Sequence, residues 1–173
     1  GGNWKANGTA DLYLNDYSVE VPENTVTGYY GQKYLDQEIY LNMNLDAVSA
    51  AGAADDDPLA GLVLRATDPC TSVSTGNNAY QIVISKSSIK IQGWKDSIKR
   101  FEQSFANSSI QPGANALIKV SAVNTEGGVD IKLKVGDTIV VQSESLFDRN
   151  ADGKLISIIY EHDILAISTK SIL

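Results

Sequence analysis

The chain has 173 residues, of which 43% are hydrophobic and 20% charged, a composition that fits one globular domain over residues 1–173 and disfavours disorder. Its formal net charge is −7. An acidic chain without an obvious basic patch is a poor partner for nucleic acid or for an anionic membrane surface, so we expect neither as a partner.

Apolar and polar residues alternate along most of the chain, with turn residues between the alternating segments. This pattern is typical of strands that bury one face, so we expect an all-β fold, a two-sheet antiparallel β-sandwich. In chain order, the predicted strands are 35–45, 60–66, 80–85, 88–94, 116–123, 129–135, 138–142, 155–161 and 164–168. Gly136 and Asp137 are expected to turn the chain between two of them.

Two segments do not follow this alternation. Residues 47–54 are rich in small side chains and are interpreted as a loop. In 96–109, the spacings of Ile98, Phe101 and Phe105 are near one helical turn, so a short helix and a packed loop are both open there.

Four short motifs follow one another along the chain: YLDQEI at 34–39, AGLVLRA at 60–66, NAYQIVI at 78–84 and IKIQGW at 89–94. Their order resembles the concanavalin-like, jelly-roll sandwich modules of glycan-degrading enzymes, including the fructan-binding modules of levanase-type enzymes. The resemblance covers roughly residues 4–168 and implies a carbohydrate ligand. One departure is 152–156, where the family has a Gly-rich strand entry with an aromatic residue.

Trp94 is the leading candidate to contact a sugar, because an aromatic ring covers the apolar face of a sugar while planar polar groups bind its hydroxyls. If Ile89 and Ile91 face the core, then Lys90, Gln92 and Trp94 share the opposite face of the strand. The alternative is a tryptophan that covers the edge of the sandwich or packs under the following loop.

Arg65 is a second candidate, since Leu62 and Leu64 take the core positions of its strand and leave Arg65 opposite. Its guanidinium can bind paired hydroxyls or a carboxylate, and the resemblance implies that this arginine lies near the binding face. The structural alternative is an ion pair with Asp36 or Glu38.

A tyrosine cluster precedes these strands. Tyr30 and Tyr34, with Tyr29, lie around Gly28 and Gly31 and could form a binding rim on a loop. Packing against the core or at one end of the sandwich is the alternative.

Asp148, Asn150 and Asp152 have the spacing that begins a calcium loop, followed by Gly153, so calcium is a candidate cofactor. The twelfth position of such a loop would be Ile159 instead of glutamate, which excludes an EF-hand. A turn made by Asp, Asn and Gly is the competing interpretation.

Signals for catalysis are few. His162 is the only histidine, and no Gly-x-Ser-x-Gly elbow accompanies it. Asp36 and Glu38 lie two residues apart on one predicted strand, without the denser acidic pattern of sandwich glycosidases. We therefore expect that this domain is not an enzyme, although a small glycosidase or lyase is a third hypothesis.

The resulting prediction is a noncatalytic carbohydrate-binding module that targets a larger extracellular enzyme to a polysaccharide or oligosaccharide. We expect a secreted or cell-surface location and a monomer within a larger multidomain protein. The alternative from another class is a structural or adhesive surface domain that binds no sugar.

Overall fold

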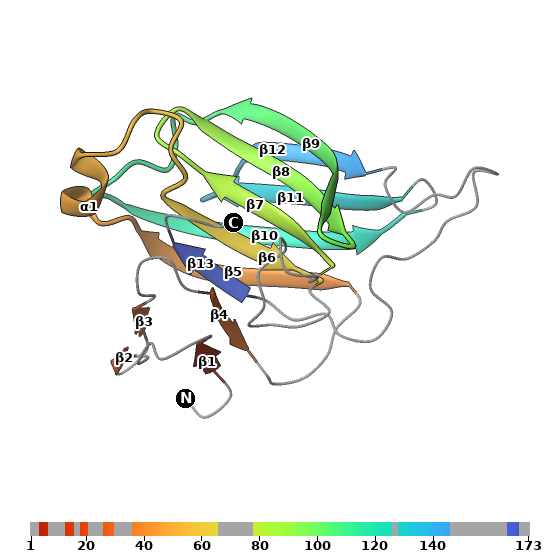
Figure 1. The fold of residues 1–173 in the computed structure, drawn as a ribbon, viewed down its shortest axis with the longest axis horizontal. Coiled ribbons are helices and arrows are strands. Elements are labelled where there is room, and N and C mark those ends of the chain that lie inside the picture. Colours follow the sequence, from red (N-terminus) through yellow and green to blue (C-terminus); the bar gives the residue numbers. More distant parts are fainter. Residues whose placement is uncertain are drawn as a thin grey trace.

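The computed structural model describes residues 4–6, 13–15, 18–20, 26–29, 36–65, 78–125, 128–145 and 166–169. Within these ranges the chain forms antiparallel sheets, and two of them stack face to face with a short helix at one end (Figure 1). This arrangement confirms the predicted all-β sandwich.

The described elements follow the chain in this order: β1 (Trp4–Ala6), β2 (Tyr13–Asn15), β3 (Ser18–Glu20), β4 (Val26–Tyr29), β5 (Gln37–Asn44), α1 (Ala47–Ala51), β6 (Ala60–Leu64), β7 (Ala79–Ile84), β8 (Ser88–Lys95), β9 (Ile98–Ala106), β10 (Asn115–Asn124), β11 (Val129–Val135), β12 (Thr138–Ser145) and β13 (Ala166–Thr169). Among them, the large sheet has the strand order β1-β4-β13-β6-β7-β8-β9, and the small sheet has the order β12-β11-β10-β5. Strands β2 and β3 form a separate pair.

The two sheets bury a common apolar core between their inner faces. The large sheet contributes Leu62, Leu64, Tyr80, Ile82, Ile84, Ile89 and Ile91, and the small sheet contributes Ile118, Val120, Ala122, Ile131, Leu133 and Val141. Burial of one such aliphatic side chain is worth roughly 1.5–3 kcal/mol relative to exposure. This shared core fixes which residues of each strand can reach solvent.

The predicted strands within the described ranges are confirmed, with boundaries that shift by up to three residues. The strand 129–135 matches β11 at both ends, and its alternation is visible in burial, because Ile131 and Leu133 are buried while Lys132 and Lys134 are partly exposed. Gly136 has φ 58° in the predicted turn, a conformation that glycine adopts without strain. The predicted strand 155–161 lies outside the described residues, and β1 to β4 were not predicted.

Residues 98–106 form a strand, so both sequence-based interpretations of this segment, a short helix and a packed loop, are wrong there. Phe101 and Phe105 are four residues apart, and this spacing places two residues on one side of a strand as well as on one side of a helix. Asp96 and Ser97 have φ values of 54° and 63°, which close a two-residue turn from β8 into β9. The tight turn makes β9 the hairpin partner of β8.

The predicted loop at 47–54 is also corrected, because Ala47–Ala51 form a short helix. Asp46 caps this helix by accepting hydrogen bonds from the backbone N–H groups of Val48 and Ser49, both at 3.2 Å. Alanine has the highest intrinsic helix propensity, which suits one capped turn.

Arg65 connects the two sheets at one end of the sandwich. It follows β6 directly and has φ 51°, so the alternation of the strand ends before it and its side chain turns inward. Its guanidinium donates to Asn124 Oδ1 at 2.6 Å and to Asp36 Oδ1 at 3.2 Å, and Asp36 also accepts from the N–H of Asn124 at 2.9 Å. The expected placement of Arg65 on the outer face is therefore wrong, and the ion pair with Asp36 is confirmed.

We expect Asp36→Asn to lower the free energy of unfolding by about 1–2 kcal/mol, measured by urea denaturation. Arg65 is fully buried, and a hydrogen bond to a charged group contributes about 1.5–3 kcal/mol, but the carboxylate is more than half exposed and water reduces the effect. Asn keeps an acceptor for the N–H of Asn124. The control Asp137→Asn, in an exposed turn, should change stability by less than about 0.5 kcal/mol; equal losses in both variants would contradict a specific role for Asp36.

Candidate functional site

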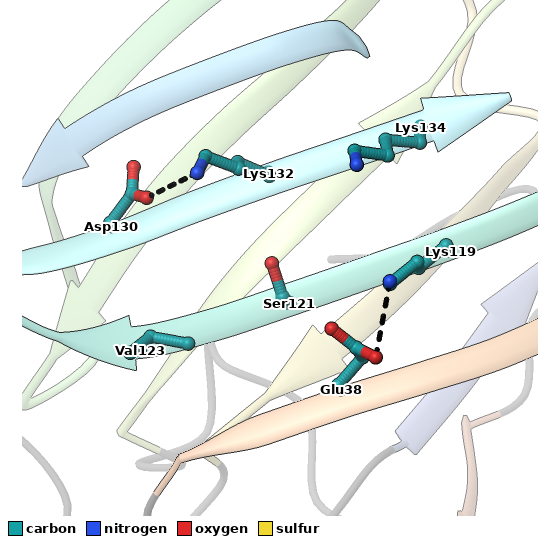
Figure 2. A pocket seen from close by; sticks show the side chains of 7 residues that line it. All are labelled: Glu38, Lys119, Ser121, Val123, Asp130, Lys132 and Lys134. Carbon is teal, nitrogen blue, oxygen red and sulfur yellow. Dashed lines mark ion pairs between the residues drawn. The ribbon is translucent and has the colours of Figure 1, made fainter. Parts of the chain in front are cut away.

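A shallow hollow of about 240 Å³ lies on the outer face of the small sheet (Figure 2). The side chains that line it come from three neighbouring strands, β5, β10 and β11: Glu38, Lys119, Ser121, Val123, Asp130, Lys132 and Lys134. Six of these seven residues carry a polar or charged group, so the hollow offers hydrogen-bonding partners to a ligand.

Ser121 creates the space at the centre of this hollow. In the register of the sheet, Ser121 on β10 is directly opposite Glu38 on β5 and Lys132 on β11. Its hydroxymethyl group is much shorter than the side chains on either side, as Figure 2 shows. The short hydroxyl side chain of Ser121 therefore lies at the centre of the hollow, and longer charged side chains surround it.

The next row across the sheet contains an exposed aromatic ring. Lys119 is opposite Tyr40 on one side and Lys134 on the other. The Tyr40 side chain is 68% exposed, and the Lys119 Nζ lies 5.1 Å from its ring centroid, within the range of a cation–π contact.

Glu38 is held by two neighbours. Its carboxylate accepts a hydrogen bond from the Tyr40 hydroxyl at 2.6 Å and forms an ion pair with Lys119 at 3.2 Å. The hydrogen bond from Tyr40, and then the interaction with Lys119, lower the pKa of Glu38 below its usual 4.5, and contacts with Tyr40 and Glu38 raise the pKa of Lys119. Both groups are thus charged around neutral pH, and their contacts hold them in position.

A second ion pair lies on β11. Lys132 Nζ is 3.1 Å from Asp130 Oδ2, and the two residues are on the same face because they are two positions apart on one strand. The hollow therefore presents fixed donors and fixed acceptors side by side.

Trp94, Gln92 and Lys90 lie on the opposite side of the sandwich, on β8 of the large sheet. They share the strand face away from Ile89 and Ile91, as expected, but Trp94 is only 8% exposed and Gln92 only 9%. The indole N–H donates to Gln92 Oε1 at 2.9 Å. Trp94 is thus a covered side chain in this structure, and a ligand-binding role for these three residues stays a prediction.

Five other predicted site residues, Tyr30, Tyr34, Asp148, Asn150 and Asp152, lie outside the described residues. Tyr29 ends strand β4, so its predicted place on a loop is wrong, while the binding roles of Tyr30 and Tyr34 and the calcium loop stay predictions. Within the described ranges, no group of three or more His, Cys, Asp or Glu side chains is placed to hold a metal ion. No helix in the described part of the chain is long and apolar enough to cross a membrane.

Sequence reasoning did not find the hollow. It considered Glu38 as a partner for Arg65 and, with Asp36, as a possible pair of catalytic carboxylates, and it did not single out Ser121 or Lys119. The alternation in 116–123 and 129–135 already indicated which positions face outward, but the pairing of β5 with β10 joins segments more than seventy residues apart in the chain. Such a pairing depends on the whole fold, and period-two alternation does not specify it.

The comparisons with known proteins agree on the fold. No protein-family model matches the chain, and no curated protein matches its sequence. A carbohydrate-binding module, CBM66 from Bacillus subtilis, is similar with a TM-score of 0.59 at 11% identity over 97% of this chain and 88% of its own. A legume lectin-like domain from Entamoeba histolytica gives 0.61 at 12% identity over 98% and 82%, and sheep galectin-11, in complex with glycerol, gives 0.50 at 10% over 88% and 96%. At these identities the likeness shows a shared lectin-like sandwich fold.

Trp94→Ala should lower the free energy of unfolding by about 3–5 kcal/mol, because it removes a large covered ring and leaves a cavity. Urea denaturation measures the loss. Leu117→Ala, which shortens a side chain that is 66% exposed, is the control and should cost less than about 0.5 kcal/mol. An unchanged stability of Trp94→Ala would mean that the ring is free to meet a ligand.

The carboxyl group of Glu38 should titrate below 4.5 in an NMR pH titration, and Tyr40→Phe should move its midpoint back up by removing the larger cause of the shift. A pKa that is lower in the folded state means that ionised Glu38 stabilises the fold above pH 4.5, and that this contribution is lost as the pH falls through the lowered value. A midpoint at or above 4.5 in the wild type would contradict the arrangement.

Proposed function

We propose that this domain binds a saccharide on the outer face of its small sheet. The observation that carries the proposal is the hollow over Ser121, with fixed charged groups around it and the exposed Tyr40 ring beside it. Sugars present apolar ring faces edged by hydroxyl groups, so a site needs an aromatic surface together with polar side chains. Both features are present on this one face.

The polar groups of the hollow suit hydroxyl groups, each of which donates one hydrogen bond and accepts others. The ammonium groups of Lys119 and Lys132 can donate to sugar oxygens, and the carboxylates of Glu38 and Asp130 can accept from sugar hydroxyls. Because the ion pairs already hold these side chains, less conformational entropy is lost on binding.

The fold gives independent support. The three similar structures are a carbohydrate-binding module, a legume lectin-like domain and a galectin. A sandwich of this kind is therefore known to carry sugar sites, although the position of the site in this chain rests on its own residues.

We further propose that binding here is not coupled to catalysis. A glycosidase needs one carboxylic acid with a raised pKa to protonate the leaving group. In the hollow the pKa of Glu38 is lowered, and Asp130 is ion-paired with Lys132. These groups suit recognition better than proton transfer.

A noncatalytic sugar site is useful when it is joined to another activity. A weak site linked to an enzyme raises the effective concentration of the polysaccharide near the catalytic domain. We propose this tethering role for a monomeric domain within a larger secreted or cell-surface protein.

A glycan array with neutral and acidic oligosaccharides tests the proposal, followed by titration of the best ligand against two variants. Ser121→Tyr fills the hollow with a residue that strands accommodate well, so it should weaken binding at least tenfold, or about 1.4 kcal/mol. Asn42→Tyr adds the same ring on the same face outside the hollow and should bind normally.

Absence of binding to every glycan would favour the alternative, a structural or adhesive domain. If a ligand binds but Ser121→Tyr has no effect, the site lies elsewhere. The face of Trp94, Gln92 and Lys90 predicted from the sequence would then be the next to test, beginning with Lys90→Gln.

A further inference from the structure

We infer that the saccharide bound by the hollow carries a carboxylate, as a uronic acid does, and that Lys134 is the residue that meets it. The inference rests on the proposed function and narrows its ligand class. It is based on the charge balance of the hollow and on the register of β10 and β11.

The hollow contains one more lysine than carboxylates. Its lining contains three lysines and two carboxylates, although the whole chain has a net charge of −7. Glu38 is paired with Lys119, and Asp130 with Lys132. Lys134 forms no ion pair with any residue in the described ranges. With two of the three lysines paired, the lining keeps one net positive charge on an otherwise acidic protein, which favours a ligand with a single negative charge.

In the register of the sheet, Lys134 lies opposite a second lysine. Lys134 on β11 is directly opposite Lys119 on β10, and its neighbour on the other side is Ile139, which is half exposed and carries no charge. Lys119 is already paired with Glu38, and the charge of Lys134 also acts on Glu38 at longer range. The hollow still carries one net positive charge, which a ligand carboxylate beside Lys134 would balance.

The remaining groups limit which anion fits. Glu38 and Asp130 also line the hollow and would repel a ligand with several closely spaced charges, such as a highly sulfated chain. The surplus is a single positive charge, which matches one carboxylate. The nearby Tyr40 ring and Ser121 hydroxyl can then contact the sugar that carries it.

The experiment titrates the uronic acid oligosaccharide that binds best on the array, and its methyl ester, against the purified domain by calorimetry. The ester has the same sugar backbone without the charge. We expect the ester to bind about tenfold more weakly and the affinity for the acid to fall as salt is added.

The variants then test whether Lys134 is responsible. Lys134→Gln should weaken binding of the acid about tenfold and leave binding of the ester unchanged, so that the effects of the variant and the ester are not additive. Lys134→Arg keeps the charge and should retain most of the preference for the acid. Lys95→Gln, which removes a lysine from β8 in the large sheet, is the matched control and should bind both ligands as the wild type does.

The outcomes separate this inference from the proposed function. Equal affinity for acid and ester, array hits that are only neutral, or a preference for sulfated over carboxylated sugars would each overturn the carboxylate assignment and leave saccharide binding in place. A loss of affinity for acid and ester alike in Lys134→Gln would overturn the role of Lys134. Failure to bind any glycan would overturn both proposals.

Discussion

The two sheets have to bury the same apolar core, and this constraint determines the chemistry of both outer faces. Strand β10 shows how. Ile118, Val120 and Ala122 are buried against the large sheet, so Lys119 and Ser121 between them must face outward. A shift of one residue in the register would bury the charged groups and expose the aliphatic ones, at a cost of several kcal/mol. The hollow is therefore held in place by the core behind it.

The outer faces of the two sheets differ in how well they are covered. On the large sheet, Val63, Gln81 and Trp94 point away from the core cluster and are nevertheless buried. On the small sheet, Tyr40 and Leu117 are each about two-thirds exposed. Strands β6 and β7 are thus covered on both sides, whereas the small sheet has one buried and one open face. An open face with a polar hollow is the better surface for a soluble ligand.

The register of the strands also determines which charged residues become neighbours on the open face of the small sheet. Rows across the sheet join residues that are distant in the chain, and ion pairs form where opposite charges become neighbours, as between Glu38 and Lys119. These exposed pairs contribute little to stability. Their physical effect is to hold polar groups at set positions, which would lower the entropy lost in the ligand binding that we propose. Ion pairs that add little to the stability of the fold can therefore matter for recognition of a ligand.

The sequence by itself determined the class of the fold and the position of most described strands, because period-two alternation is a local property that each segment carries on its own. It also indicated the turn at Gly136 and offered Asp36 as a partner for Arg65. Only the tertiary structure decided that 98–106 is a strand, because a spacing of four residues suits both a strand and a helix.

The tertiary structure also decided the direction of the Arg65 side chain, since one left-handed residue ends the alternation from which its position was predicted. The hollow depends on structure in the same way. Its residues become neighbours only when β5 pairs with β10 and β10 with β11, and the choice of partner strands is a property of the whole packed sandwich that no single segment encodes.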